Sequence, residues 1–243
     1  FKPGARWEYS VASDVLGRVV EQVSGTALER FFTDKIFAPL GMIETGFSVP
    51  ETDLRRFATL YASHPDTALS LKPAPTGVPI LRTIDSAGDS CFRNPAGFSG
   101  GGGLVSTLED YMRFCEMLRR GGHLEGVRIL GPKTVQAMTM ARLAPEVRDN
   151  GATEYPASHL YPGQSFGLGF GVITNPAQSQ VISSQGEYSW GGIANTKFWV
   201  DPEEDLVVIL MTQVIGAPYG DRLRFDLKVA TYQALSRLGT SSR

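Results

Sequence analysis

The sequence has few of the residues on which disulfide-stabilised and metal-binding proteins depend. Its 243 residues include two cysteines, Cys91 and Cys115, which are too few for a disulfide framework and lack the spacing of a zinc site. The three histidines, His64, His123 and His159, form no H-x-x-x-H pair, and none stands beside a carboxylate at metal-ligand spacing. We therefore expect neither a metal nor another cofactor.

Two further absences limit the class of partner. Lysine and arginine number 23 against 25 aspartate and glutamate, so the net charge of −2 offers no basic field for a phosphate backbone. No stretch approaches the roughly 20 unbroken apolar residues of a membrane span. We expect no nucleic-acid partner and no membrane span, and the compartment, cytoplasmic or periplasmic, stays open. Hydrophobic residues make up 42% and charged residues 20%, which is ordinary for a globular protein.

Helical punctuation dominates the first forty residues. Apolar positions from Ser10 onward recur at helical spacing, and Gly25 is suited to the left-handed position that ends a helix. Thr26 followed by Glu29 matches a capping box and predicts a second helix that ends around Gly41.

Helices and turns are also predicted for the middle of the chain. Prolines interrupt any long element over 48–103. Thr107 with Asp110 then predicts the start of an amphipathic helix that ends at Gly121-Gly122, and Pro132 is suited to the first position of another.

The last third of the chain predicts a sheet. Residues 166–173, 180–184, 194–201 and 206–213 have the composition of strands, and a helix is predicted to begin at Asp221. We therefore expect an α+β fold in which 1–160 form a helical, loop-rich region and 161–243 form an antiparallel sheet with a covering terminal helix.

A G-x-S-x-G match at 97–101 centres on Ser99. A nucleophile elbow needs a strand before the serine and a helix directly after it, and here neither is predicted. We interpret the motif as a structural glycine loop. Among the histidines, we expect His123 to be a solvated residue at a helix end, and His159 would be the better base if a triad existed.

Two aromatic motifs lie far apart in the chain. One is Tyr9-Ser10-Val11 before the first predicted helix, and the other is Trp190-Gly191-Gly192. Each has a structural explanation by itself: aromatic residues before a helix often pack as staples, and Trp-Gly-Gly is compatible with a strand kink. The two motifs become informative together, because they occur in a fixed order with three further segments: Pro3-Gly4, Gly101–Leu104 and Asp201-Pro202.

The ordered set resembles the serine β-lactamase-like, penicillin-recognising hydrolases of class C type, and within them the family VIII carboxylesterases. The resemblance implies the β-lactamase/transpeptidase-like fold and cleavage of a small ester through an acyl-enzyme, with a serine and lysine in S-x-x-K as nucleophile and partner. It implies that Tyr9 is the catalytic tyrosine and that Trp190, Gly191 and Gly192 form the substrate strand. The backbone N–H of Ile193 would then point at the oxyanion.

Two departures from the family pattern affect this interpretation. No serine of the sequence has a lysine three residues later, so we expect S-x-x-K to lie in a segment upstream of Phe1 and the chain alone to be inactive. Val11 stands where β-lactamases place an asparagine, and Trp190 replaces a lysine, which favours an uncharged ester over a lactam.

Other interpretations stay open at the level of the sequence. A β-lactamase, a D-alanyl-D-alanine carboxypeptidase and an acyltransferase share the same chemistry. A non-catalytic binding module that keeps the pocket and lacks the nucleophile belongs to a different class.

Overall fold

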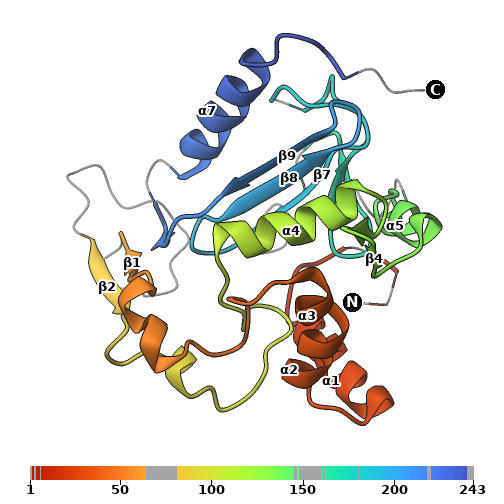
Figure 1. The fold of residues 1–243 in the computed structure, drawn as a ribbon. Coiled ribbons are helices and arrows are strands. Elements are labelled where there is room, and N and C mark those ends of the chain that lie inside the picture. The colour runs from red at the N-terminus through yellow and green to blue at the C-terminus, as the bar shows by residue number, and fades with distance from the viewer. Residues whose placement is uncertain are drawn as a thin grey trace.

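The computed structural model describes residues 2, 4–5, 7–63, 81–144, 147, 160, 162–179, 181–217 and 220–239. A five-stranded antiparallel sheet, in the order β5-β6-β7-β8-β9, forms its centre (Figure 1). Its strands are β5 (Gln164–Phe166), β6 (Gly171–Ile173), β7 (Tyr188–Gly191), β8 (Lys197–Asp201) and β9 (Leu206–Leu210).

The sheet corrects two strand predictions. The run 166–173 is not one strand, because residues 167–170 form the connection of the β5–β6 hairpin. Residues 181–184 lie outside any strand, and Gln180 lies outside the described residues. The strand that pairs with β8 is β7, which begins at Tyr188. The predictions over 194–201 and 206–213 are confirmed in their cores by β8 and β9.

Helices α4 and α7 lie on opposite faces of this sheet (Figure 1). Helix α4 (Leu108–Arg119) begins as predicted, because the Thr107 hydroxyl accepts a hydrogen bond of 3.2 Å from the Asp110 N–H. Helix α7 (Gly220–Gln233) is the predicted terminal helix, and it ends before Leu238, which is exposed. The α+β arrangement of helices and antiparallel sheet is confirmed.

The N-terminal helices follow the predicted order with a different cap. Helix α1 (Ala12–Ser24) ends at Gly25 in the left-handed conformation, φ +68°, as predicted. The capping box is wrong: α2 (Leu28–Phe32) has Ala27 at its cap, and the Leu28 N–H donates to Glu21 Oε1 at 3.0 Å. The chain continues through a π-helical turn, η1 (Thr33–Phe37), into α3 (Ala38–Leu40).

A smaller sheet joins the middle of the chain to its end. Strand β1 (Leu60–Ala62) pairs with β2 (Arg82–Asp85) on one side and, in parallel, with β10 (Val214–Ile215) on the other. The 3-10 turns η2 (Glu51–Arg56) and η3 (Cys91–Arg93) flank it in sequence. The division of the chain at residue 160 therefore stays a prediction.

The remaining elements lie between α4 and the large sheet in sequence. Strands β3 (His123–Leu124) and β4 (Val127–Arg128) form a hairpin, and α5 (Pro132–Met138) starts with proline at its first position, as predicted.

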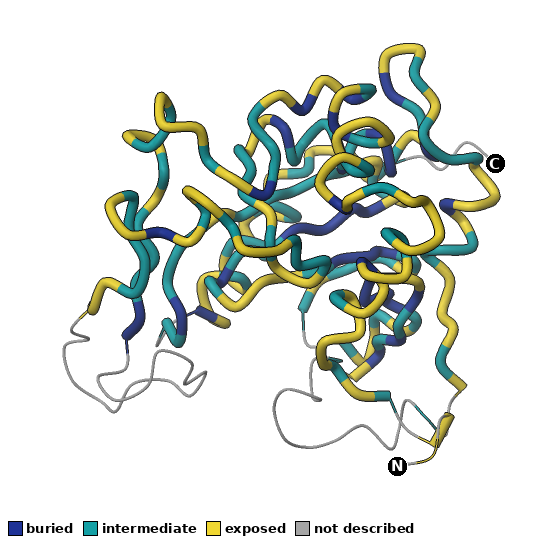
Figure 2. Tube along the Cα trace, turned by 90° about the horizontal axis from the view of Figure 1, so that it is seen from below, coloured by how far each residue is buried: buried dark blue, intermediate teal, exposed yellow. Residues whose placement is uncertain are grey.

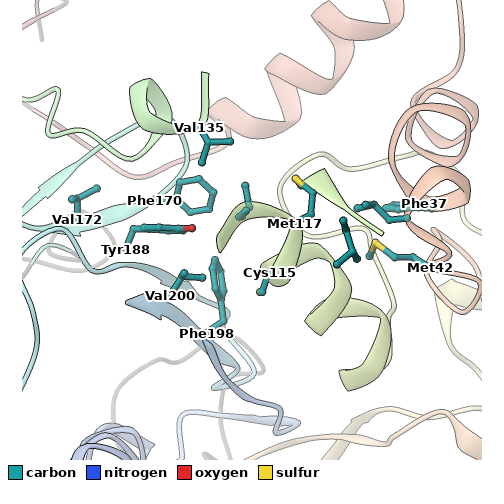
Figure 3. Close-up of a cluster of buried hydrophobic side chains, with 13 residues drawn as sticks. Phe37, Met42, Cys115, Met117, Val135, Phe170, Val172, Tyr188, Phe198 and Val200 are labelled. Carbon is teal, nitrogen blue, oxygen red and sulfur yellow. The ribbon is translucent and has the colours of Figure 1, made fainter. Parts of the chain in front are cut away.

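The core lies between α4 and one face of the large sheet (Figure 3). Side chains of a strand alternate between its two faces, so Phe198 and Val200 of β8 point to this core. They meet Cys115 of α4, which is completely buried, and the cluster extends to Phe37 and Met42 of the N-terminal region. Figure 2 shows buried stretches running through the middle of the molecule, with shorter ones nearer its edges.

Candidate active site

Two motifs that are 181 positions apart in the sequence meet in the structure. The ring centroids of Tyr9 and Trp190 lie 5.6 Å apart with an interplanar angle of 43°. Tyr9 precedes α1, and Trp190 is the third residue of β7. Both side chains are half-buried. The fold thus places the phenol beside the Trp-Gly-Gly strand, as the resemblance implies, while their catalytic roles stay a prediction.

Two further rings extend this contact into an aromatic cluster. Phe166 of β5 lies 5.1 Å from Trp190, edge to face at 72°, and Trp7 lies 5.2 Å from Phe166. Aromatic pairs in such tilted arrangements contribute about 0.5–1.5 kcal/mol beyond the area that they bury. Phe166 was not predicted as a site residue, because nothing in the local sequence connects it with Trp190. The cluster gives the site an apolar wall.

The connection from β7 to β8 is a tight turn. The Gly192 N–H donates to the Thr196 carbonyl at 3.0 Å, and the Asn195 N–H donates to the Gly192 carbonyl at 3.0 Å. The Ala194 carbonyl accepts the Thr212 hydroxyl at 2.7 Å and the Val214 N–H at 3.1 Å. The turn is thus held by hydrogen bonds within itself and by hydrogen bonds to the segment after β9.

Ile193 stands at the outer end of this turn. Its side chain is exposed, and its N–H makes no hydrogen bond to any other part of the described chain. A fixed backbone N–H without an internal partner is suited to receive an oxyanion. That role for Ile193 remains the prediction made from the sequence.

The structure supplies an internal reason for the two glycines. A Cβ on Gly191 would lie 2.9 Å from the Thr196 carbonyl oxygen, and one on Gly192 would lie 2.5 Å from the Thr196 hydroxyl. Side chains at these positions would force the turn open. Apart from any role toward substrate, the turn itself needs these glycines.

Ser99 lies in a packed loop. Its hydroxyl donates a hydrogen bond to the Asp14 carboxylate in the first turn of α1, and Ser99 Oγ accepts the Gly102 N–H at 3.1 Å. No strand precedes it over the described residues 86–98, and the next helix is α4, which starts at Leu108. The predicted absence of the nucleophile-elbow context is confirmed, and the hydroxyl stabilises the loop against α1.

The histidine predictions have a mixed outcome. His123 is not a solvated residue at a helix end, because it begins strand β3 and its Nδ1 atom is buried. His64 and His159 lie outside the described residues.

A serine–lysine contact occurs on the other face of the sheet. Lys197 Nζ donates to Ser189 Oγ at 3.1 Å, and burial, with the nearby charges of Arg224 and Lys228, lowers the pKa of Lys197 to about 8. Ser189 precedes Trp190 in β7, so their side chains point to opposite faces. Ser189 is 4% exposed and lies on the face that α7 covers, so the pair lies on the face of the sheet opposite to Trp190.

Neither metal ligands nor a membrane span are found in the described part of the chain. No three histidine, cysteine, aspartate or glutamate side chains within it gather where they could hold a metal ion. None of its helices has the length and apolarity to cross a bilayer.

Comparison with known proteins identifies relatives over most of the chain. The family model described as Beta-lactamase matches residues 1–231. Protein Rv1367c of Mycobacterium tuberculosis is 33% identical over 215 residues, which are 87% of this chain and 50% of that protein. Esterase EstB of Burkholderia gladioli is 30% identical over 238 residues, which are 96% of this chain and 56% of that protein.

A solved structure has the same fold. The structure of EstCE1, described as a hydrolase with promiscuous acyltransferase activity, superposes with a TM-score of 0.73 at 28% identity. The superposition covers 96% of this chain and 57% of that chain. The chain therefore spans about half the length of the relatives that it matches.

Proposed function

The chain belongs to the Beta-lactamase family and has the β-lactamase/transpeptidase-like fold, and on this premise we propose that the protein containing it is a serine carboxylesterase. The proposed reaction is cleavage of short acyl esters through an acyl-enzyme. The observation that carries the proposal is the ring contact of 5.6 Å between Tyr9 and Trp190.

The proposed nucleophile and its lysine belong to a further segment with the S-x-x-K motif. Relatives about twice as long leave room for such a segment, and helix α1 offers a surface to cover. Its apolar residues Val15, Leu16, Val19 and Val23 are exposed, as is Val11 at its N-cap. Single exposed apolar residues are normal on a protein surface, but five large ones along one helix form a patch of the kind that marks an interaction surface.

Each residue of the site has a role in the proposed first step. With the lysine ammonium stabilising its phenolate form, Tyr9 takes the proton of the serine hydroxyl as the oxygen bonds to the acyl carbon. The negative charge moves to the carbonyl oxygen, which accepts hydrogen bonds from the Ile193 N–H and from the nucleophile's own N–H. The C–O bond to the alcohol then breaks, and Tyr9 returns the proton to the departing oxygen.

The second step repeats the first with water in place of serine. Water attacks the acyl carbon as Tyr9 accepts its proton. The bond between the acyl carbon and the serine oxygen then breaks, Tyr9 gives its proton to that oxygen, and the acid leaves. Trp190, with Phe166 and Trp7 behind it, presents an apolar surface to the ester. This surface favours an uncharged substrate over a charged lactam.

Acyl transfer is the second candidate. The aromatic cluster of Trp7, Phe166 and Trp190 could hold an alcohol where water would attack, so that the alcohol takes the acyl group. EstCE1, by its description, combines both activities. Product analysis in the presence of an added alcohol separates transfer from hydrolysis.

The experiment that tests the proposal uses the full-length gene product. Short-chain p-nitrophenyl esters, a chromogenic cephalosporin and a peptidyl-D-alanine are compared, and a fluorophosphonate probe identifies the nucleophile. We expect ester turnover and labelling of the serine in S-x-x-K, with labelling unchanged in Ser99→Ala. Labelling at Ser99, or a gene product without S-x-x-K, would contradict the proposal.

A further inference from the structure

The turn that carries Ile193 is bound by a cation from the terminal helix. Arg224 lies in the second turn of α7, and its Nη2 atom donates to the Gly192 carbonyl at 3.2 Å and to the Thr196 carbonyl at 3.1 Å. These are the same two carbonyls that accept the hydrogen bonds across the base of the turn. One guanidinium nitrogen thus connects the residue after β7 with the residue before β8.

The geometry of the peptide unit connects this contact with the oxyanion donor. The Gly192 carbonyl and the Ile193 N–H belong to one peptide group, which is planar and trans. Its C=O and N–H therefore point in opposite directions. When Arg224 holds the oxygen on the side of α7, the N–H of Ile193 is directed away from α7.

The charge of Arg224 has a second effect on the same group. A hydrogen bond from a cation to a carbonyl is stronger than one between neutral groups. It polarises the peptide, and a polarised peptide is a better donor through its N–H. The guanidinium thus both aims and strengthens the proposed donor without touching the substrate.

From this geometry we infer that Arg224 is a positioning residue that orients the Ile193 N–H for the oxyanion. The inference rests on the proposed function, and it adds to it a group outside the site. Other contacts support a fixed placement of the helix start. A Cβ on Gly220 would lie 3.1 Å from Asn195 Nδ2, so α7 begins in close contact with the turn.

The test compares Arg224→Ala and Arg224→Lys in the full-length protein, with Arg222→Ala as the matched control. Arg222 lies on the same helix, its side chain is 76% exposed, and it pairs with Asp226 at 3.3 Å. Turnover of a p-nitrophenyl ester is expressed per active site, counted by fluorophosphonate labelling. Hydrogen exchange of backbone amides over 190–197 is measured in parallel.

A misdirected donor weakens transition-state binding more than substrate binding. Loss of one oxyanion donor costs about 100- to 1,000-fold in kcat, so we expect Arg224→Ala to lower kcat by about 10- to 50-fold with KM changed less than about threefold. Arg224→Lys keeps the charge but lacks the planar guanidinium, so its kcat should lie between those of the wild type and Arg224→Ala. Exchange should increase over 190–197 alone.

The outcomes separate this inference from the proposed function. A wild-type protein without ester turnover overturns both. An active wild type with an Arg224→Ala kcat within twofold of its own, or equal to that of Arg222→Ala, overturns the inference alone. A higher KM at constant kcat would assign Arg224 to substrate binding and likewise overturn it. Faster exchange over the whole protein in Arg224→Ala would mean that Arg224 stabilises the fold in general, and would also overturn the inference.

Discussion

The ammonium nitrogen of Lys228 in α7 lies 2.5 Å from Oε1 of Glu187, the residue that precedes β7. The Glu187 side chain is 1% exposed, so this ion pair is buried at its acidic end. Lys228 also lies 5.6 Å from the centre of the Trp199 ring. The pair connects the terminal helix with the strand that carries the Trp-Gly-Gly motif.

Removal of the cation alone should therefore destabilise the protein. We expect Lys228→Met to lower the free energy of unfolding by about 3 kcal/mol, because it leaves a buried carboxylate without its cation. Urea denaturation measures the loss, and Lys133→Met, which removes a lysine from the exposed surface of α5, is the control. The double variant with Glu187→Gln should lose less than Lys228→Met. Equal losses in the two would contradict a coupled pair.

A second prediction concerns the pH dependence that Glu187 imposes. The Tyr232 hydroxyl lies 2.9 Å from Glu187 Oε2 and 2.5 Å from Asp201 Oδ2. A hydroxyl has one proton and can donate to only one of two ionised carboxylates, so Glu187 and Asp201 cannot both accept a hydrogen bond from Tyr232. Burial raises the pKa of Glu187, against the opposing effects of Lys228 and Tyr232. Glu187 therefore keeps its proton to higher pH in the folded state than in the unfolded state.

The sign of the effect follows from this difference. Above about pH 4.3, the ordinary pKa of glutamate, the folded state binds more protons than the unfolded one, so stability falls as pH rises to the raised pKa. Unfolding free energies measured in urea from pH 4 to pH 8 should show this contribution. Glu187→Gln should remove it, and Glu203→Gln, which changes an exposed glutamate, should not. The same slope in both variants would exclude Glu187 as its source.

Local chemistry explains which parts of the fold could be predicted from the sequence. Gly25 ends α1 and Thr107 caps α4 because each depends on a few neighbouring residues. The capping box at Thr26 failed because Glu21, from the preceding helix, binds the first amide of α2. The strand predicted over 180–184 failed because pairing with β8, and not local composition, selects 188–191.

The same distinction applies to the candidate site. Tyr9 and Trp190 could be named in advance because the order of two motifs resembled a known family. The contact of Phe166 with Trp190 and that of Arg224 with the turn after β7 could not, because no short sequence pattern records either one. The Asp14 contact of Ser99 joins residues 85 positions apart and is equally invisible in the sequence.

The role of Tyr9 can be separated from its packing. In the full-length protein, Tyr9→Phe keeps the ring against Trp190 and removes only the hydroxyl. We expect ester kcat to fall by at least about 100-fold, the range of general acid–base catalysis, while the thermal midpoint stays within about 2 °C. Tyr61→Phe, in the separate β10-β1-β2 sheet, is the control. Unchanged turnover in Tyr9→Phe would remove the phenol from the mechanism.

The glycine loop around Ser99 offers a comparison within four residues. A Cβ on Gly100 would lie 2.4 Å from the Ser13 carbonyl oxygen, and this oxygen belongs to the backbone of α1, which cannot move aside without disturbing the helix. A Cβ on Gly102 would have nothing within 4 Å. The loop is therefore packed closely on α1 at Gly100 and is open at Gly102.

Alanine should destabilise the protein at Gly100 and have almost no effect at Gly102. Gly100→Ala should lower the free energy of unfolding by about 1–3 kcal/mol, the range of overpacked sites. Gly102→Ala should change it by less than about 0.5 kcal/mol, as at an open surface position. Urea denaturation of both variants decides the matter. Because α1 begins three residues after Tyr9, displacement of the helix by Gly100→Ala should also lower ester turnover. Equal stability of the two variants would mean that the loop is not packed on α1.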